Sequence, residues 1–414
     1  MHLKKLLALP LAAACLVGMM GCAAKSAAND LTKDIKKTEQ AVCLDESAQD
    51  QTIEAMTGFG VALLQNAIES SNPLISPLSI DAALSMTANG AVGETKAQME
   101  TVLGADTEAL RAYFSALQNS LNDDKQLKLA NSIWLKDTPA LHVEEAFLQK
   151  NADAFGAGIF SAPFDASTVK SINSWVSQNT DKMIPEMLSE IQQDTVMYLI
   201  NALAFDAKWE RVFETSDVWD GTFTARGGAQ QTGSFLHGVE YRYLSDTNAE
   251  GFLKTYAGGK YAFAALLPEE GTSLEDYTAA LTGERLHAIL TSPKEEAVEM
   301  SMPKFKTDFT VELSDSLKSL GMPDAFDSLL ADFSSLGTSD EGNLYISSVL
   351  HKTFIQVDEA GTKAGAATAV DMTTESAAMY PHSVFLTRPF LYMIVDMETG
   401  LPVFLGALTE LPEV

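Results

Sequence analysis

The sequence predicts an α+β fold, and two observations support this prediction. Helical periodicity gathers in the early part of the chain and strand-like runs in the later part, so the regular strand–helix alternation of a βαβ protein is missing. No internal repeat and no Pro-, Gly- or Ser-rich linker divides residues 51–414. With 46% hydrophobic residues overall, a region of this length can bury a large core. We therefore expect one domain.

The individual elements follow from the spacing of apolar residues. Helical spacing predicts helices over 51–70, 80–89, 95–103, 108–121, 143–155 and 168–182. Strand-like runs cover 127–135, 196–205, 261–267, 298–305, 344–358, 390–396 and 402–408. The longest weakly patterned stretch is 360–382, which we interpret as a long loop.

The first residues have the form of a signal peptide. Lys4 and Lys5 precede an apolar run over 6–20, which is too short for a typical membrane span. The Gly-Cys-Ala-Ala sequence around Cys22 resembles the lipobox of bacterial lipoproteins, which implies cleavage before Cys22 and a lipid on its thiol. Two alternatives remain: lipidation at Cys15, after a core of only about nine apolar residues, and a plain secretory signal.

These features divide the chain into three parts. We assign 1–21 to the signal peptide, 22–50 to a lipid-anchored polar tether and 51–414 to the folded domain. Cys43, in the tether, cannot form an internal disulfide alone, so the domain depends on its core. The expected location is outside the cytoplasm, as a cell-surface or outer-membrane lipoprotein or an extracellular protein.

The charge of the chain excludes several partners. It has 56 acidic and 28 basic residues, a net charge of −28. Loss of the two leader lysines would make this −30. Such a protein cannot bind nucleic acid by neutralising phosphates, and anionic lipid headgroups repel it. Membrane attachment then depends on the lipid alone, and we expect a monomer.

The most informative segment runs from Val357 to Val370. It is rich in very small residues, yet it alternates with period two like a half-buried strand. Lys363 and Asp371 fall on one face. The other face carries only small side chains: Thr362, Ala364, Ala366, Thr368 and Val370. A loop needs this pattern if it later has to enter a sheet.

The surrounding residues resemble the serpins, the serine-protease inhibitors that work by loop insertion. His351 to Thr362 (HKTFIQVDEAGT) resembles the family's strand and hinge. Further blocks agree in the family's order: 72–80 with 83–86 and 90–91, 172–180, 199–202 with Trp209, 387–390, and 404–406. The similarity spans 51–412. Two positions depart from the usual pattern: Thr387 replaces Asn or Asp, and Asp206-Ala207 replaces Lys-Gly.

The resemblance implies the serpin fold, with a large mixed or antiparallel main sheet, smaller sheets, about eight or nine helices, and an exposed reactive-centre loop at about 360–382. It also implies two groups of functional residues. The hinge consists of Glu359, Gly361, Thr362, Ala364, Ala366 and Thr368. The cluster where the sheet opens consists of Ser76, Ser79, Asn201, His351 and Trp209.

In the implied mechanism, a target serine protease attacks the loop, and the cleaved loop inserts into the main sheet and traps the acyl-enzyme. The family's usual spacing from Glu359 places the reactive bond at Glu375-Ser376. Because S1 pockets rarely accept an acid, nearby bonds stay open: beside Val370, Met372, Ala377, Ala378 or Met379, or at Asp371 for an aspartate-specific protease. No Lys or Arg occurs from Ala364 to Thr387, which favours elastase-like or chymotrypsin-like targets over trypsin-like ones.

An enzymatic function finds no support in the sequence. It contains no Gly-x-Ser-x-Gly elbow, His-Glu-x-x-His, Cys-x-x-Cys or phosphate-loop motif. No two histidines after the leader have metal-ligand spacing. We therefore expect no catalytic residue, metal or cofactor. Two other functions remain open: a non-inhibitory surface binding protein with the same fold, and a cysteine-protease inhibitor that uses the same loop.

Overall fold

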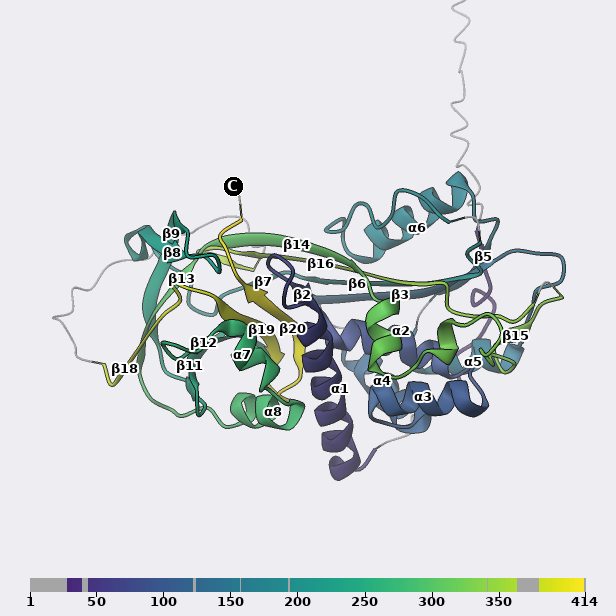
Figure 1. Ribbon diagram of the computed structural model, residues 1–414, viewed down its shortest axis with the longest axis horizontal. Helices are drawn as coiled ribbons and strands as arrows, with labels where there is room; N and C mark the ends of the chain where they lie inside the picture. The colour runs from purple at the N-terminus through teal and green to yellow at the C-terminus, as the bar shows by residue number, and fades with distance from the viewer. Residues whose placement is uncertain are drawn as a thin grey trace, which may run out of the picture.

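The structure is a computed structural model that describes residues 28–38, 44–121, 124–156, 158–192, 194–340, 342–362 and 380–412. It is an α+β fold, as predicted. The main sheet runs along the long axis of the molecule (Figure 1), with α6 on one face and helices α2 to α5 on the other. The two further sheets of more than two strands lie towards one end of this axis.

The main sheet has eight strands in the order β1-β5-β3-β6-β16-β17-β7, with β14 also paired to β16. β3 pairs parallel with β5 and antiparallel with β6, while β6 and β16 are parallel, so the sheet is mixed. Its strands are β1 (Asn29–Asp30), β3 (Leu127–Lys136), β5 (Gly158–Ala162), β6 (Met197–Phe205), β7 (Ala207–Lys208), β14 (Phe305–Glu312), β16 (Ser348–Val357) and β17 (Gly361–Thr362).

The other sheets are mainly antiparallel. The six-stranded sheet has the order β10-β11-β12-β19-β20-β2, and the four-stranded sheet has the order β18-β13-β9-β8. The former contains β2 (Leu74–Ile75), β10 (Tyr243–Ser245), β11 (Ala249–Thr255), β12 (Tyr261–Pro268), β19 (Phe390–Asp396) and β20 (Pro402–Leu408). The latter contains β8 (Val218–Thr224), β9 (Gln230–Glu240), β13 (Val298–Pro303) and β18 (His382–Phe385). β4 (His142–Val143) pairs with β15 (Gly337–Thr338).

Nine α-helices occur in the described part of the chain: α1 (Glu46–Ala67), α2 (Pro77–Ala88), α3 (Gly93–Leu103), α4 (Thr107–Leu121), α5 (Glu145–Ala154), α6 (Ala166–Asn179), α7 (Leu274–Ala279), α8 (Gly283–Thr291) and α9 (Ser314–Leu320). α2 is buried on all sides, including its polar residues Ser79, Asp81, Ser85 and Thr87. The Ser76 side chain caps its first turn and Pro77 occupies its first position, where a missing N–H costs no hydrogen bond.

Both faces of the main sheet are buried. On the α6 face, Trp134 stacks on Phe160 with ring centroids 4.4 Å apart, and Ile172 and Val176 of α6 are fully buried. On the other face, α2 packs beneath β3 and β6. β6 accordingly has no exposed residue along its length, unlike a strand with one solvated face.

The structure differs from the predicted elements in several places, and α7, α8, α9, β5, β10 and β11 had no predicted counterpart. The predicted strand 298–305 is two strands, because the chain leaves the four-stranded sheet at Pro303 and begins β14 of the main sheet at Phe305. The strands β8 and β9 were not predicted, since their polar, glycine-containing sequences show little apolar alternation. α1 begins at Glu46 rather than residue 51, because Asp45 caps a polar first turn.

Residues 28–38, which the sequence analysis assigns to a polar tether, contact the folded domain. Asn29 and Asp30 pair with β5 as an edge strand of the main sheet, and the Leu31 backbone N–H donates to the Ile159 carbonyl at 2.8 Å. The Thr38 backbone N–H and hydroxyl donate to Asp153 at 2.7 and 2.6 Å. This part of the segment therefore packs on the fold.

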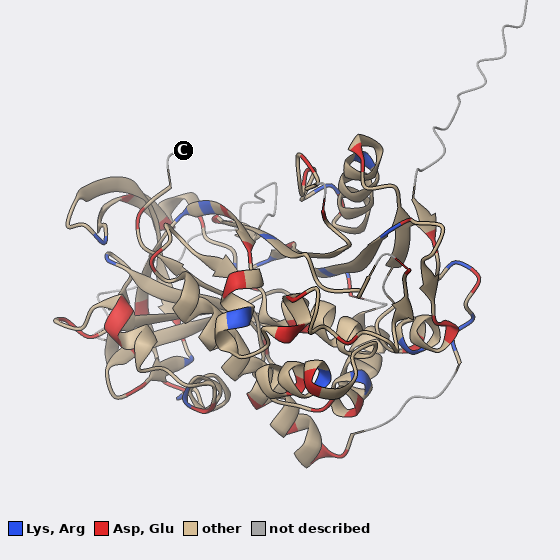
Figure 2. Cartoon of the chain, turned by 45° about the vertical axis from the view of Figure 1, so that its right-hand side comes forward, with Lys and Arg blue, Asp and Glu red and all other residues tan. Residues whose placement is uncertain are grey.

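Three properties of the described residues bear on possible partners: the distribution of acidic residues, membrane-spanning helices and metal sites. Acidic residues are spread along both helices and loops of the chain (Figure 2). Among the described residues, no helix combines the length and apolar character needed to cross a membrane. The same residues contain no group of three His, Cys, Asp or Glu side chains placed to hold a metal ion.

Candidate functional site: the hinge and the sheet opening

The start of the predicted hinge is already part of the main sheet. β17 pairs antiparallel with β16 on one side and with β7 on the other, so it separates the C-terminal end of β16 from β7. Thr362 lies opposite Val357 of β16 and opposite Ala207 of β7. Further down, β16 pairs directly with β6 through residues 348–353. The sheet is thus open at the hinge and closed below it.

The Thr362 side chain is fully buried in the intact chain. Its Oγ1 lies 2.6 Å from the hydroxyl of Tyr256, whose ring stacks on Trp209 with centroids 4.4 Å apart and an interplanar angle of 13°. The alternation of the sequence predicts this inward orientation. β17 thus holds the Thr362 side chain inward before the loop is cut.

A tight turn leads from β16 into β17. The Asp358 side chain accepts hydrogen bonds from the backbone N–H groups of Ala360 and Gly361, at 2.9 and 3.2 Å. Gly361 has a φ of 156°, and a Cβ atom there would lie 2.1 Å from the Ala207 carbonyl oxygen. Glycine is therefore required at this position, both for the backbone conformation and for the close approach of β7.

Contacts from outside the turn hold it in place. The Trp209 indole N–H donates to the Asp358 carbonyl at 2.8 Å, and the Trp209 backbone N–H donates to the Ala360 carbonyl at 3.0 Å. Lys304 forms an ion pair with Glu359 at 2.6 Å. The hydrogen bond from Lys304 lowers the pKa of Glu359, so this carboxylate stays ionised well below neutral pH.

The buried polar cluster lies beneath the closed part of the sheet. His351 and Asn201 are opposite each other across the β6–β16 seam, with His351 Nδ1 2.5 Å from Asn201 Oδ1. The Ser76 backbone N–H donates to His351 Nε2 at 3.0 Å, which places the imidazole proton on Nδ1. Burial lowers the pKa of His351 to about 3, so the ring is neutral and structural.

The same cluster contains a hydrogen-bond donor that is not used. Ser79 Oγ lies 2.8 Å from Asn201 Oδ1 and 3.2 Å from Asn131 Oδ1. Asn201 Nδ2, by contrast, is buried without a hydrogen-bond partner among the described residues. A buried donor of this kind is costly, and a strand arriving at this seam could supply the missing acceptor.

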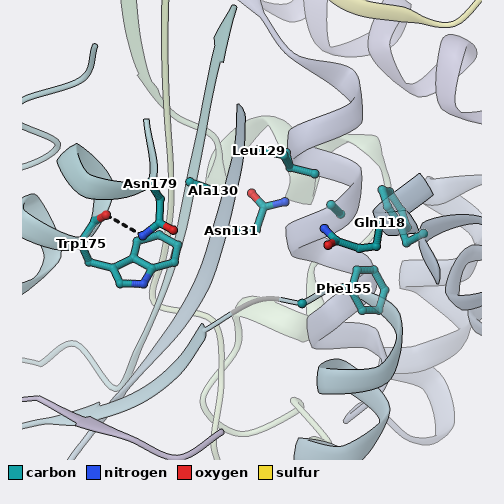
Figure 3. A pocket seen from close by; sticks show the side chains of 10 residues that line it. Gln118, Leu129, Ala130, Asn131, Phe155, Trp175 and Asn179 are labelled. Atoms are coloured by element: carbon teal, nitrogen blue, oxygen red, sulfur yellow. Dashed lines mark hydrogen bonds between the residues drawn. The ribbon is translucent and has the colours of Figure 1, made fainter. Parts of the chain in front are cut away.

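A small cavity of about 110 Å³ lies beside β3. Figure 3 shows Trp175 and Asn179 of α6 on one side of β3 and Gln118 and Phe155 on the other, with Asn131 between them. Among the described residues, β5 pairs with β3 only from Ser132 onwards, so residues 127–131 of β3 have no described strand beside them on that edge. The strand therefore has room to shift without breaking dense packing.

The structure places Ser76, Ser79, Asn201 and His351 in one polar cluster. Trp209 lies instead at the hinge, beside the turn from Asp358 to Thr362. The other predicted site residues lie outside the described residues: Cys22, Ala364, Ala366, Thr368, Met372, Glu375, Ser376, Ala377 and Met379.

Sequence reasoning missed three residues of the site. Tyr256 binds the Thr362 hydroxyl, Lys304 pairs with Glu359, and Asn131 shares Ser79 with Asn201. Tyr256 lies in the connection between β11 and β12, and Lys304 is the single residue between β13 and β14. Neither spacing nor periodicity indicates a role for them. Asn131 offered a signal, since it is a polar residue at a core position of the strand 127–135.

Comparisons with known proteins agree with this geometry. The family model described as Serpin (serine protease inhibitor) matches residues 54–411. This chain belongs to the serpin family. Leukocyte elastase inhibitor A of Mus musculus is 31% identical over 382 residues, covering 86% of this chain and 98% of that protein. The fold prediction is thereby confirmed, and protease inhibition is the general activity of the family.

Among solved structures, this serpin is similar to the native state of the thermophilic serpin tengpin, with a TM-score of 0.88, 44% identity, and coverage of 93% of this chain and 100% of that one. The latent state of tengpin superposes less well, with a TM-score of 0.78 at the same identity. The conformation described above, open at the hinge and closed below, is therefore the one that resembles a native serpin.

Proposed function

We propose that this serpin is a suicide-substrate inhibitor of serine endopeptidases. The observation that supports it most is β17, which separates β16 from β7 at the upper end of a seam that closes further down. Once a protease cuts the loop and holds its upstream end as an acyl-enzyme, the strand begun at β17 lengthens between β6 and β16.

The register of β17 indicates where each later residue would go. Because Thr362 pairs with Val357 and Ala207, each step of two along the loop moves two residues back along β16 and β6. Thr368 then arrives between His351 and Asn201, which face each other in the closed seam. Its hydroxyl would meet the unused Asn201 amide donor and replace the His351–Asn201 hydrogen bond.

The same register explains why small residues are needed. Val357 and His351 lie on the α2 side of β16, so Thr362 and the residues in phase with it face α2. A large or charged side chain there would meet the fully buried face of α2 and slow insertion.

About a dozen inserted residues gain hydrogen bonds on both sides, at roughly 0.5–1.5 kcal/mol each. The seam must break six register pairs in return, and the net gain remains on the order of 10 kcal/mol, enough to distort a bound protease.

We propose an elastase-like or chymotrypsin-like target, because residues 364–387 contain no Lys or Arg. A mouse relative named for leukocyte elastase supports this class. We further propose that Glu375-Ser376, or a bond close to it, is the reactive bond, and that Cys22 carries a lipid that anchors the exported protein to a membrane.

The test is a panel of elastase-like, chymotrypsin-like, trypsin-like and cysteine proteases, each incubated with the protein and analysed on denaturing gels. We expect a complex that resists denaturation with the first two classes. Loop cleavage with no such complex would refute inhibition and favour a non-inhibitory binding protein. A complex formed only with cysteine proteases would refute the serine target.

A further inference from the structure

A second cavity, of about 280 Å³, lies between α4, the start of α1 and the turn that joins β19 to β20. None of the described hinge residues lines it. Its walls are mostly apolar: Leu78, Ala112, Leu117, Leu127, Leu401 and Val403. Its rim is polar, with Gln49, Ser120 and Glu398. A mostly apolar enclosure with a few polar groups is the usual form of a small-molecule site.

One wall of the cavity is formed by Tyr113, which is only 6% exposed. Its ring packs edge-on against Phe114, with centroids 5.5 Å apart. Its hydroxyl forms no hydrogen bond with any described residue of the chain. A ligand in the cavity could therefore form a hydrogen bond with this hydroxyl.

The hydroxyl lies among carboxyl groups. Asp396, which also lines the cavity, accepts three hydrogen bonds on Oδ1, from Glu398 N at 3.0 Å, Thr399 N at 3.2 Å and Thr399 Oγ1 at 3.3 Å. Its Oδ2 has no such bond with the described residues. Burial, with Asp396 and Asp81 nearby, raises the pKa of Tyr113, and burial raises the pKa of Asp396 itself.

One cation lies close to the cavity: Lys260 Nζ donates to Ser120 Oγ on the rim at 3.1 Å. Among the described residues that line the cavity, none is Lys, Arg or His. Lys260 lies near Asp396 but is engaged by Asp124, whose Oδ2 is 2.7 Å from its Nζ. The polar end of the cavity therefore offers acceptors and negative charge.

We propose that this cavity is a binding site for a small organic amine with one apolar group. The ammonium would donate to Asp396 Oδ2 and the Tyr113 hydroxyl, and the apolar group would lie against Leu78, Leu117 and Val403. An ammonium also compensates the desolvated carboxyl of Asp396, whereas a carboxylate ligand would be repelled by it and by Glu398. The volume accommodates one six-membered ring with a short amine chain.

The test uses calorimetric titration of the full chain with phenethylamine, 2-phenylethanol and 3-phenylpropionate, three probes of similar size that differ in charge. We expect phenethylamine to bind with a Kd of about 1 mM or tighter, the alcohol to bind about tenfold more weakly, and the carboxylate not to bind. Equal binding of all three probes, or no binding of the amine, would overturn the proposal.

Two variants locate the site. Tyr113→Phe should weaken amine binding about tenfold, the effect of one hydrogen bond to a charged group. Tyr392→Phe is the matched control, because its hydroxyl likewise has no partner among the described residues but does not line this cavity. Asp396→Asn should abolish the preference for the amine over the alcohol. Unchanged binding by Tyr113→Phe would refute the assignment. Because the readout is binding alone, the result is independent of protease inhibition.

Discussion

Two threonine substitutions distinguish the part of the loop that is already in the sheet from the part that would enter it. The Thr362 and Tyr256 hydroxyls lie 2.6 Å apart and both residues are fully buried. Thr362→Val keeps the shape of the side chain but leaves the Tyr256 hydroxyl without a partner, which costs roughly 1–3 kcal/mol. Because Thr362 occupies the same position before and after insertion, this cost should fall equally on the intact and the loop-cleaved protein.

Thr368→Val should behave differently. In the proposed register Thr368 reaches His351 and Asn201 only after cleavage, so the intact protein should be unaffected and the cleaved protein should lose roughly 1–3 kcal/mol. For a domain of about 360 residues, 1 kcal/mol corresponds to about 1.3 °C in Tm, from an unfolding entropy of about 2.1 cal/mol/K per residue. The expected losses are therefore about 1–4 °C.

The assay is thermal unfolding of each variant, intact and after the loop has been nicked near Glu375 by limited proteolysis. Thr387→Val, an exposed threonine beyond the loop, is the control and should change neither form. Nicked wild type should unfold about 10 °C or more above the intact protein, as a gain on the order of 10 kcal/mol requires. No gain on nicking would refute insertion. A Thr368→Val loss that is equal in both forms would refute the register.

Three further predictions concern single residues. Thr362→Arg places a charge in a fully buried site, so the hinge should leave the sheet and Trp209 fluorescence should change. The variant should become a substrate with a high stoichiometry of inhibition, whereas the control Lys363→Glu should inhibit like wild type. One-to-one trapping of the protease by Thr362→Arg would contradict the mechanism. Burial raises the pKa of Asp81 to about 7, above its value of 3.8 when unfolded, so the wild type loses stability as pH rises from about 4 to 7. Asp81→Ala should therefore have a free energy of unfolding a few kcal/mol above that of wild type at pH 8, and this difference should disappear towards pH 4. A difference that does not vary with pH would disprove the assignment. Cys22→Ser should release the protein from the membrane fraction or block its maturation, and unchanged partitioning would exclude a lipid on Cys22.

The sequence by itself determined those helices and strands whose burial leaves a regular pattern in neighbouring residues. The apolar run of α2, with Ser76 and Pro77 at its start, and the strands β19 and β20 are readable because burial along a helix or strand imposes its own period on the side chains. The small-residue alternation after Val357 indicated a loop that could enter a sheet. The resemblance to serpins then supplied the fold and named Glu359, Gly361, Asn201 and His351.

Tertiary structure alone decided how these residues act together. Thr362 is seated in the intact chain because β7 and β16 diverge there and Tyr256, more than one hundred residues away, offers its hydroxyl. The pairing of Lys304 with Glu359, and the cavity between Tyr113 and Asp396, likewise join residues from distant parts of the sequence. Periodicity reports which face of an element is buried, but it carries no information on which distant element covers that face. Only the packed chain places one polar group within hydrogen-bonding distance of another or leaves it without a partner.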